Sequence, residues 1–209
     1  MEKILRRLWH IFRSQSLEKI AENAHATHLP VLIGMSKRLE IRKVLEFGSG
    51  INSTLLFLNR KAFPKMEEIV SYENNLEWLN VVKQKTTPDL RVKLHYYNGK
   101  MKDCANAEAI ANYDLIFIDD STTAHDRAET IKEVLKQNPK LAIIHDFETF
   151  AYRRMASRFC RAYRFKALLP NVGVCGNFSV AELKKIEAII SKNKKTISPD
   201  DISSWLGKF

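Results

Sequence analysis

The sequence predicts an α/β protein built on one doubly wound, mostly parallel β-sheet. From residue 43 onward, short runs rich in Val, Ile, Leu, Phe or Tyr alternate with helix-like stretches. Such alternation indicates parallel βαβ units whose helices cover both faces of the sheet. The last two runs, residues 164–169 and 172–180, are joined only by Pro170 and Asn171. A parallel connection needs about a dozen residues, so these two strands are predicted to form an antiparallel hairpin.

The predicted core elements follow one another in regular alternation. The expected strands cover residues 43–48, 68–73, 91–97, 113–119 and 140–146, and the expected helices cover about 53–61, 75–85, 104–111 and 124–137. A helix near 149–159 leads into the hairpin, and another at 181–193 follows it. Together these elements predict a seven-stranded, Rossmann-like core over residues 41–193, followed by a polar tail over 194–209.

Residues 1–40 are predicted to form a helical extension of this single domain. Ile4, Leu8 and Phe12 lie on one stripe of an amphipathic helix over 2–23, with basic residues on the other side. A shorter helix is expected around 30–38. An amphipathic helix of this kind packs on its own domain, on a twin subunit to form a homodimer, or on a membrane surface. The sequence leaves these alternatives open.

Length and composition favour one domain in the cytoplasm. A chain of 209 residues, 45% of them hydrophobic, is long enough to bury a sizeable core. No apolar run approaches the roughly 18 residues that a membrane-spanning helix needs. The three cysteines are widely spaced and form no CxxC pair, which predicts reduced thiols and argues against a zinc site.

The net charge of +10 is unevenly distributed. Residues 1–43 carry a net charge of +5, residues 44–146 a net charge of −2 and residues 147–209 a net charge of +7. Basic flanks of this kind attract acidic partners, including nucleic acid. An ordinary solvated surface is the competing interpretation.

The most informative motif is the turn after the first strand, Leu45-Glu46-Phe47-Gly48-Ser49-Gly50. Glycines at such a turn let a nucleoside-bearing cofactor approach the backbone. The third glycine of a dinucleotide fingerprint would fall at position 53, which is Ser53. Glu46 would repel a diphosphate and attract a positively charged group. We therefore expect a cofactor without phosphate and with a cationic end, a description that S-adenosylmethionine meets.

The other predicted strands also end in acids, amides or glycines. These residues are Glu73 after the second strand, Asn98-Gly99 after the third, Asp119-Asp120 after the fourth and His145-Asp146 after the fifth. Ligands of open α/β sheets bind beyond the carboxyl ends of the strands, so these residues are expected at one edge. Glu73, 23 residues after Gly50, is placed to accept both hydroxyls of a ribose.

The stretch VLEFGSGINSTLLFL, together with IVSYENNLEWL, YDLIFIDDS and AIIHDFE, resembles the class I S-adenosylmethionine-dependent methyltransferases, particularly small bacterial O-methyltransferases. The resemblance covers about residues 40–180. It implies that Glu46, Gly48 and Gly50 bind the methionine end of the cofactor, with Ser49 and Ser53 in the same loop. It places Glu73 and Asn74 at the ribose, and Asn98 and Gly99 at the adenine. Asp119 would lie near the methionine and the acceptor.

Asp119, His145 and Asp146 are the candidate catalytic residues. A histidine with a pKa near neutrality can take a proton from an acceptor hydroxyl. Two carboxylates on neighbouring strands could also hold Mg²⁺. Metal-dependent catechol-type O-methyltransferases, however, follow the second acid with an amide, and here that position is Phe147. We therefore predict no metal ligands, with Mg²⁺ as the less favoured alternative.

The sequence thus predicts an enzyme that transfers a methyl group from S-adenosylmethionine to a hydroxyl of a small molecule or glycoside. An RNA methyltransferase served by the basic flanks is one alternative. A non-catalytic binding protein that kept the fold is another. Aminopropyl transfer is a third, because YDLIFIDDST is similar to the fourth strand of that family.

Overall fold

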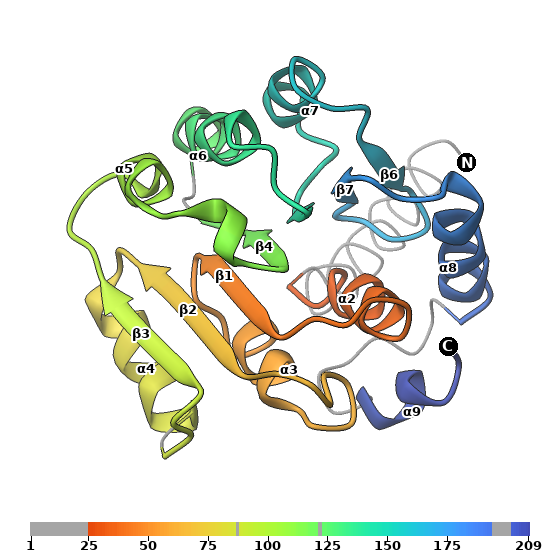
Figure 1. The fold of residues 1–209 in the computed structure, drawn as a ribbon, viewed down its shortest axis with the longest axis horizontal. Coiled ribbons are helices and arrows are strands. Elements are labelled where there is room, and N and C mark those ends of the chain that lie inside the picture. The colour runs from red at the N-terminus through yellow and green to blue at the C-terminus, as the bar shows by residue number, and fades with distance from the viewer. Residues whose placement is uncertain (1–24, 87, 121–122, 194–201) are drawn as a thin grey trace, which may run out of the picture.

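The computed structural model describes residues 25–86, 88–120, 123–193 and 202–209, and the predicted helix over 2–23 lies outside them. Seven strands form one sheet in the order β3-β2-β1-β4-β5-β7-β6 (Figure 1). The strands are β1 Lys43–Phe47, β2 Glu68–Glu73, β3 Val92–Tyr96, β4 Leu115–Ile118, β5 Leu141–Ile144, β6 Tyr163–Phe165 and β7 Val172–Gly176. The predicted Rossmann-like architecture is confirmed.

The pairing directions follow the prediction. Strands β1 to β5 pair in parallel, so that Leu45 lies beside Val70 of β2 and beside Ile116 of β4. Strand β7 is antiparallel to both β5 and β6. The carboxyl ends of the five parallel strands consequently meet at one edge of the sheet.

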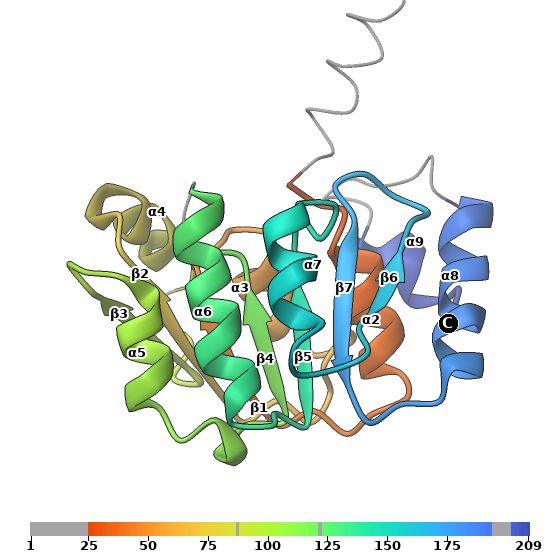
Figure 2. The same ribbon diagram turned by 90° about the horizontal axis from the view of Figure 1, so that it is seen from above.

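Helices cover both faces of the sheet, as Figure 2 shows. On one side lie α2 (Leu29–Ser36), α3 (Ser53–Leu58), α4 (Leu76–Thr86), α8 (Val180–Asn193) and α9 (Ile202–Leu206), and on the other α5 (Met101–Ala107), α6 (Ala124–Lys136) and α7 (Phe150–Ala156). Successive strand residues alternate between the two apolar cores: Val44 packs into the first and Leu45 into the second. This alternation follows from the two-residue period of a strand.

Several predicted boundaries were wrong by three or more residues. The helices expected at about 53–61 and near 149–159 end at Leu58 and Ala156, and the strand expected over 164–169 ends at Phe165. The helix expected at 104–111 begins at Met101 and ends at Ala107, and a short 3₁₀ helix, Ile110–Asn112, follows it. The last strand, expected to reach residue 180, ends at Gly176. Gly176 has φ +147°, and a Cβ there would lie 2.4 Å from the Phe178 ring. The chain therefore leaves the sheet at this glycine.

The end of the chain also differs from the predicted polar tail. Residues Ile202–Leu206 form α9, which contacts α2. Trp205 is only 1% exposed and packs in the same core as α2 and α8, with its ring stacked on Phe209. Ile202, Trp205, Leu206 and Phe209 have the i, i+3, i+4, i+7 spacing of an amphipathic helix, a signal that the prediction of a polar tail missed.

The structure also bears on the question of a membrane span. None of the helices that the structure describes is both long and apolar enough to cross a bilayer.

Candidate functional site

The glycine turn passes directly over the tip of β4. Gly48 has φ +87°, and a Cβ at this position would lie 2.4 Å from the backbone oxygen of Asp119. L-residues with side chains rarely adopt this conformation, and the backbone of the neighbouring strand cannot easily retreat. The Gly48 N–H donates to the Tyr72 carbonyl at 2.9 Å. The turn thus joins the ends of β1, β2 and β4.

Glu46 lies inside the protein beneath this turn. Its side chain is fully buried, and its Oε2 accepts hydrogen bonds from the hydroxyls of Thr54 and Ser71, both at 2.6 Å. Thr54 Oγ1 in turn accepts from the Gly50 N–H at 3.1 Å. The other oxygen, Oε1, has no hydrogen-bond partner among the described residues. Glu46 therefore anchors the turn and offers one buried acceptor oxygen.

Burial raises the pKa of Glu46 to about 7, although the nearby hydroxyls of Ser53, Ser71 and Thr54 act in the opposite direction. In the folded protein Glu46 thus holds its proton over a pH range in which the unfolded chain has released it. The stabilisation that comes from this bound proton is fully present below pH 4.5, the ordinary pKa of the group in the unfolded chain. It is lost as the pH rises through the folded-state pKa of about 7.

Glu46→Gln should remove this pH dependence. We expect the difference in unfolding free energy between variant and wild type to shift in favour of the variant by about 2–3 kcal/mol between pH 4.5 and 7.5, because the amide never becomes charged. Urea unfolding at several pH values measures this difference. Parallel stability curves for the two proteins would contradict the assignment.

Glu73 lies at the tip of β2, where the sequence predicted the ribose contact. Its Oε1 accepts the backbone N–H groups of Asn74 and Asn75 at 2.9 and 2.8 Å. Its Oε2 accepts a long hydrogen bond of 3.4 Å from the Ser49 hydroxyl. Burial raises the pKa of this carboxyl, opposed by the backbone hydrogen bonds from Asn75 and Asn74. One oxygen is thus held by the chain, and the other has room for a closer donor.

The remaining predicted cofactor residues surround these two acids. Ser49 and Ser53 are buried in the glycine loop and at the start of α3, whereas Asn74, Asn98 and Gly99 are exposed beyond β2 and β3. Trp78 of α4 is 37% exposed and donates its Nε1–H to the Ser49 carbonyl at 2.7 Å. This bond ties α4 to the glycine loop. It was not predicted, because the sequence offers no signal for it.

A buried arginine joins the acids at the tips of β4 and β5. Arg127 of α6 is 6% exposed, and its Nη1 lies 3.1 Å from Asp119 Oδ1 and 2.7 Å from Asp146 Oδ2. Its Nε donates to the Asp120 carbonyl. The position between the two carboxylates, where Mg²⁺ was the less favoured alternative, thus holds a guanidinium group.

His145 is buried between Asp119 and Thr27. Its side chain is 3% exposed, with Nδ1 3.1 Å from Asp119 Oδ2 and Nε2 2.9 Å from Thr27 Oγ1. Burial lowers the pKa of His145, but the Asp119 carboxylate outweighs it and the net shift is upward. Burial raises the pKa of Asp119, but the charges on His145 and Arg127 lower it overall. Because both ring nitrogens of His145 are engaged, this arrangement favours a role in orienting Asp119.

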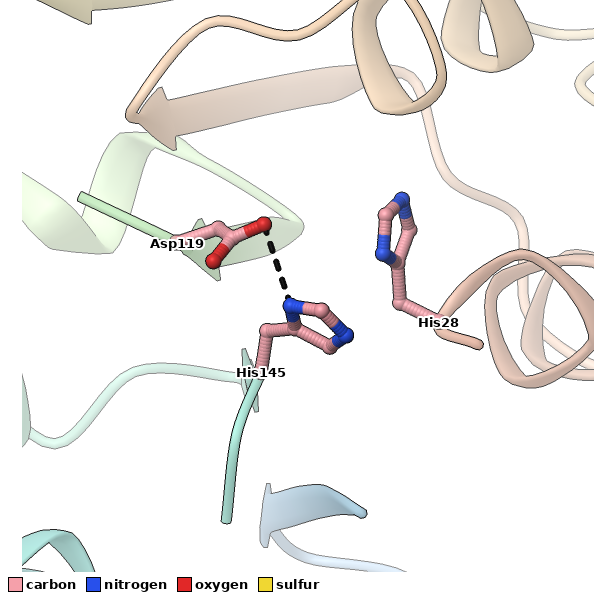
Figure 3. A group of neighbouring side chains, drawn as sticks. All are labelled: His28, Asp119 and His145. Carbon is pink, nitrogen blue, oxygen red and sulfur yellow. Dashed lines mark ion pairs between the residues drawn. The ribbon is translucent and has the colours of Figure 1, made fainter. Parts of the chain in front are cut away.

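His28, which no sequence motif identified, completes this group of side chains. It precedes α2, is 2% exposed, and lies with its ring 4.9 Å from the rings of both Phe117 and His145. Burial, and secondarily the neighbouring His145, lowers the pKa of His28 to about 3. Figure 3 shows His28 across from the Asp119–His145 pair. It lies before the first recognisable motif, so no sequence pattern singled it out.

A separate surface cavity of about 370 Å³ lies at the opposite edge of the sheet. Its lining includes Lys140, which precedes β5, and Cys175 and Gly176, which end β7. None of the strand-tip acids lines it. The candidate site is therefore defined by the strand tips and not by this cavity.

The sequence matches no family model and no curated protein. Solved structures do resemble the fold. One is the methyltransferase domain of bacterial CtHen1, with 14% sequence identity and a TM-score of 0.54; the match covers 74% of this chain and 100% of that chain. Another is human methyltransferase-like protein 13 in complex with SAH, with 17% identity and a TM-score of 0.53; the match covers 85% of this chain and 94% of that chain. Spermidine synthase from Thermotoga maritima is similar as well, with 14% identity and a TM-score of 0.51; the match covers 90% of this chain and 74% of that chain. The chain thus has the class I S-adenosylmethionine-dependent methyltransferase fold.

Proposed function

We propose that this chain is an S-adenosylmethionine-dependent methyltransferase that acts on a hydroxyl group of a small molecule or glycoside. The observation that carries the proposal is the strand-tip edge of this fold, where a left-handed glycine turn at Gly48 and an acid at Glu73 lie beside each other. A dinucleotide fold of the usual order has its sixth strand next to the fifth, whereas here the antiparallel β7 takes that place.

The residues present fit this cofactor. Glu73 Oε2, which accepts a long hydrogen bond of 3.4 Å from the Ser49 hydroxyl, suits the ribose hydroxyls. The unpartnered Oε1 of Glu46 suits a donor at the cationic methionine end, beside the turn formed by Gly48, Ser49 and Gly50. The partly exposed Trp78 ring, with Asn98 and Gly99, suits the adenine. When bound, S-adenosylmethionine supplies a methyl group activated by its positively charged sulfur.

The acids at β4 and β5 would receive the proton that an acceptor hydroxyl gives up. Asp146 and Asp119 have partly exposed side chains, 34% and 26%, whereas His145 is buried. We therefore assign proton transfer to Asp146, with Asp119 positioned by His145 and Arg127. Because methyl transfer depends mainly on alignment of the reactants, this proton transfer is expected to contribute only part of the rate enhancement.

The test is methyl transfer from methyl-labelled S-adenosylmethionine to panels of hydroxylated and amine acceptors. We expect label in a hydroxyl acceptor, and a kcat about 100-fold lower for Asp146→Asn. Asp126→Asn is the control, since Asp126 is a partly exposed acid at the start of α6 that pairs with Lys100 and lies outside the group at the tips of β4 and β5. Cofactor binding without transfer to any acceptor would instead favour the non-catalytic alternative.

A nucleic-acid acceptor is the second candidate, and it is supported by one observation. Residues 147–209 carry a net charge of +7, and Arg154, Arg158 and Arg161 are exposed on and after α7. Affinity for structured RNA that falls steeply with rising salt would support this candidate. Binding that is absent at low salt would remove it.

A further inference from the structure

We propose that His28, Asp119 and His145 form a binding site for a divalent transition-metal ion that prefers nitrogen ligands, such as Zn²⁺. One ligand atom from each residue lies within 4.8 Å of the others (Figure 3). Around a zinc ion, bonds of about 2.0–2.2 Å place ligand atoms roughly 3–4 Å apart. Small side-chain rotations would therefore bring all three onto one ion.

The strongest evidence is the unpartnered imidazole of His28. Both of its ring nitrogens are buried and have no hydrogen-bond partner among the described residues. Buried polar atoms are nearly always paired, so such a group calls for an explanation. The ring is fixed by packing on Phe117, and one nitrogen lies on the side that faces Asp119 and His145. A metal ion between the three residues would give that nitrogen a partner.

Thr27 supplies the support that a histidine ligand usually has. Its Oγ1 lies 2.9 Å from His145 Nε2. Metal-bound histidines commonly donate their other N–H to an oxygen, which fixes the tautomer and the ring orientation. With Nε2–H donated to Thr27, His145 Nδ1 is the ligand atom beside Asp119 Oδ2. Without metal, the same Nδ1 can carry the proton and donate it to Asp119.

Charge and ligand type determine the kind of ion. Asp119 and Asp146 bring two negative charges, and Arg127 neutralises only one of them. Arg127 binds Asp119 through Oδ1, so Oδ2 remains on the side of the histidines. Two imidazoles and one carboxylate suit zinc or ferrous iron, whereas magnesium prefers oxygen ligands. The site therefore differs in place and in ligands from the magnesium alternative at Asp119 and Asp146.

The consequence of such an ion rests on the proposed function. Asp119 is the most exposed of the three ligands, so open coordination positions would face the side from which an acceptor approaches. A hydroxyl bound there would be polarised by the ion, and its proton would leave more readily. Asp146, which is not a ligand, stays available to take that proton.

The test titrates the full chain with Zn²⁺ alone, in the absence of cofactor, by calorimetry. We expect one ion per chain and an affinity at least about 100-fold lower for His28→Phe and for Asp119→Asn. His28→Phe keeps a ring against Phe117 and removes both nitrogens. His95→Ala is the matched control, because His95 is exposed on β3 and lies outside the cluster. Its affinity should equal that of wild type.

X-ray absorption of the zinc-loaded wild type gives a result that no variant's folding can affect. Two imidazole ligands and at least one oxygen ligand are expected. Wild type that binds no Zn²⁺, His28→Phe that binds as tightly as wild type, or loss of binding in His95→Ala would overturn the site. The zinc titration contains no cofactor, so it is independent of the titration with S-adenosylmethionine. A chain that binds Zn²⁺ but not S-adenosylmethionine would contradict only the proposed function. A chain that binds S-adenosylmethionine but not Zn²⁺ would contradict only the metal site.

Discussion

Arg127→Met should destabilise the protein by about 2–4 kcal/mol, because it leaves two partly buried carboxylates without their cation. Arg127 is 6% exposed and contacts Asp119 and Asp146 through one nitrogen. For a chain of this size each kcal/mol lowers Tm by roughly 2–4 °C, so thermal unfolding should occur about 4–16 °C lower. Methionine retains most of the apolar volume, so loss of packing contributes little.

Lys136→Met on the same helix is the control for this variant. Lys136 forms an ion pair with Glu133 at 2.9 Å, but its side chain is 50% exposed, and such a pair contributes at most about 1 kcal/mol. Adding Asp146→Asn to Arg127→Met should restore part of the lost stability, since one uncompensated charge is removed. Equal Tm values for Arg127→Met and Lys136→Met would show that the arginine does not neutralise the two acids.

Glu73→Ala should weaken S-adenosylmethionine binding at least about 100-fold, because the charge-assisted hydrogen bonds that the proposed function assigns to Glu73 Oε2 and the ribose hydroxyls would be lost. Such bonds contribute about 1.5–3 kcal/mol each, and a 100-fold change in Kd corresponds to about 2.8 kcal/mol. Glu73→Gln keeps an acceptor oxygen and should give an intermediate Kd. Calorimetric titration with the cofactor measures all three proteins.

Glu77→Ala provides the comparison for Glu73→Ala. Glu77 is an exposed acid in the first turn of the following helix, α4, and its replacement should leave the Kd unchanged. Because Glu73 also holds the N–H groups of Asn74 and Asn75, thermal unfolding of each variant checks that the loop stays folded. Wild-type affinity in Glu73→Ala would remove the ribose assignment.

The fold could be predicted from the sequence because its determinants are local. Short apolar strands alternate with helices, and the link between β6 and β7, residues 166–171, is too short for anything but a hairpin. Glycines and acids at strand ends are likewise brought together by the direction of the strands alone. The positions of Gly48, Glu73 and Asp119 at the strand-tip edge therefore follow from the order of the strands and their parallel direction.

Residues delivered to the site by other elements could not be placed in this way. Arg127 comes from the first turn of α6 and His28 from the segment before α2, and only tertiary packing brings them to Asp119. The burial of His145 depends on the same packing. Its sequence neighbour Asp146 suggests a strand tip open to solvent, yet Thr27 and His28 cover the imidazole.

Glu46 was identified from the sequence, but its burial could not be predicted. Its position in the motif predicted an acid that attracts a cationic group. The structure places the carboxylate inside the protein, where it binds Thr54 and Ser71. Its influence on a ligand would then pass mainly through the glycine turn, and its one unpartnered oxygen is the atom to examine in a complex.

Calorimetric titration of the wild-type chain with S-adenosylmethionine tests the central claim most directly. We expect one binding site per chain with a Kd of about 100 µM or tighter, equivalent to roughly −5.5 kcal/mol or more. Absence of binding at millimolar cofactor would contradict the proposed function.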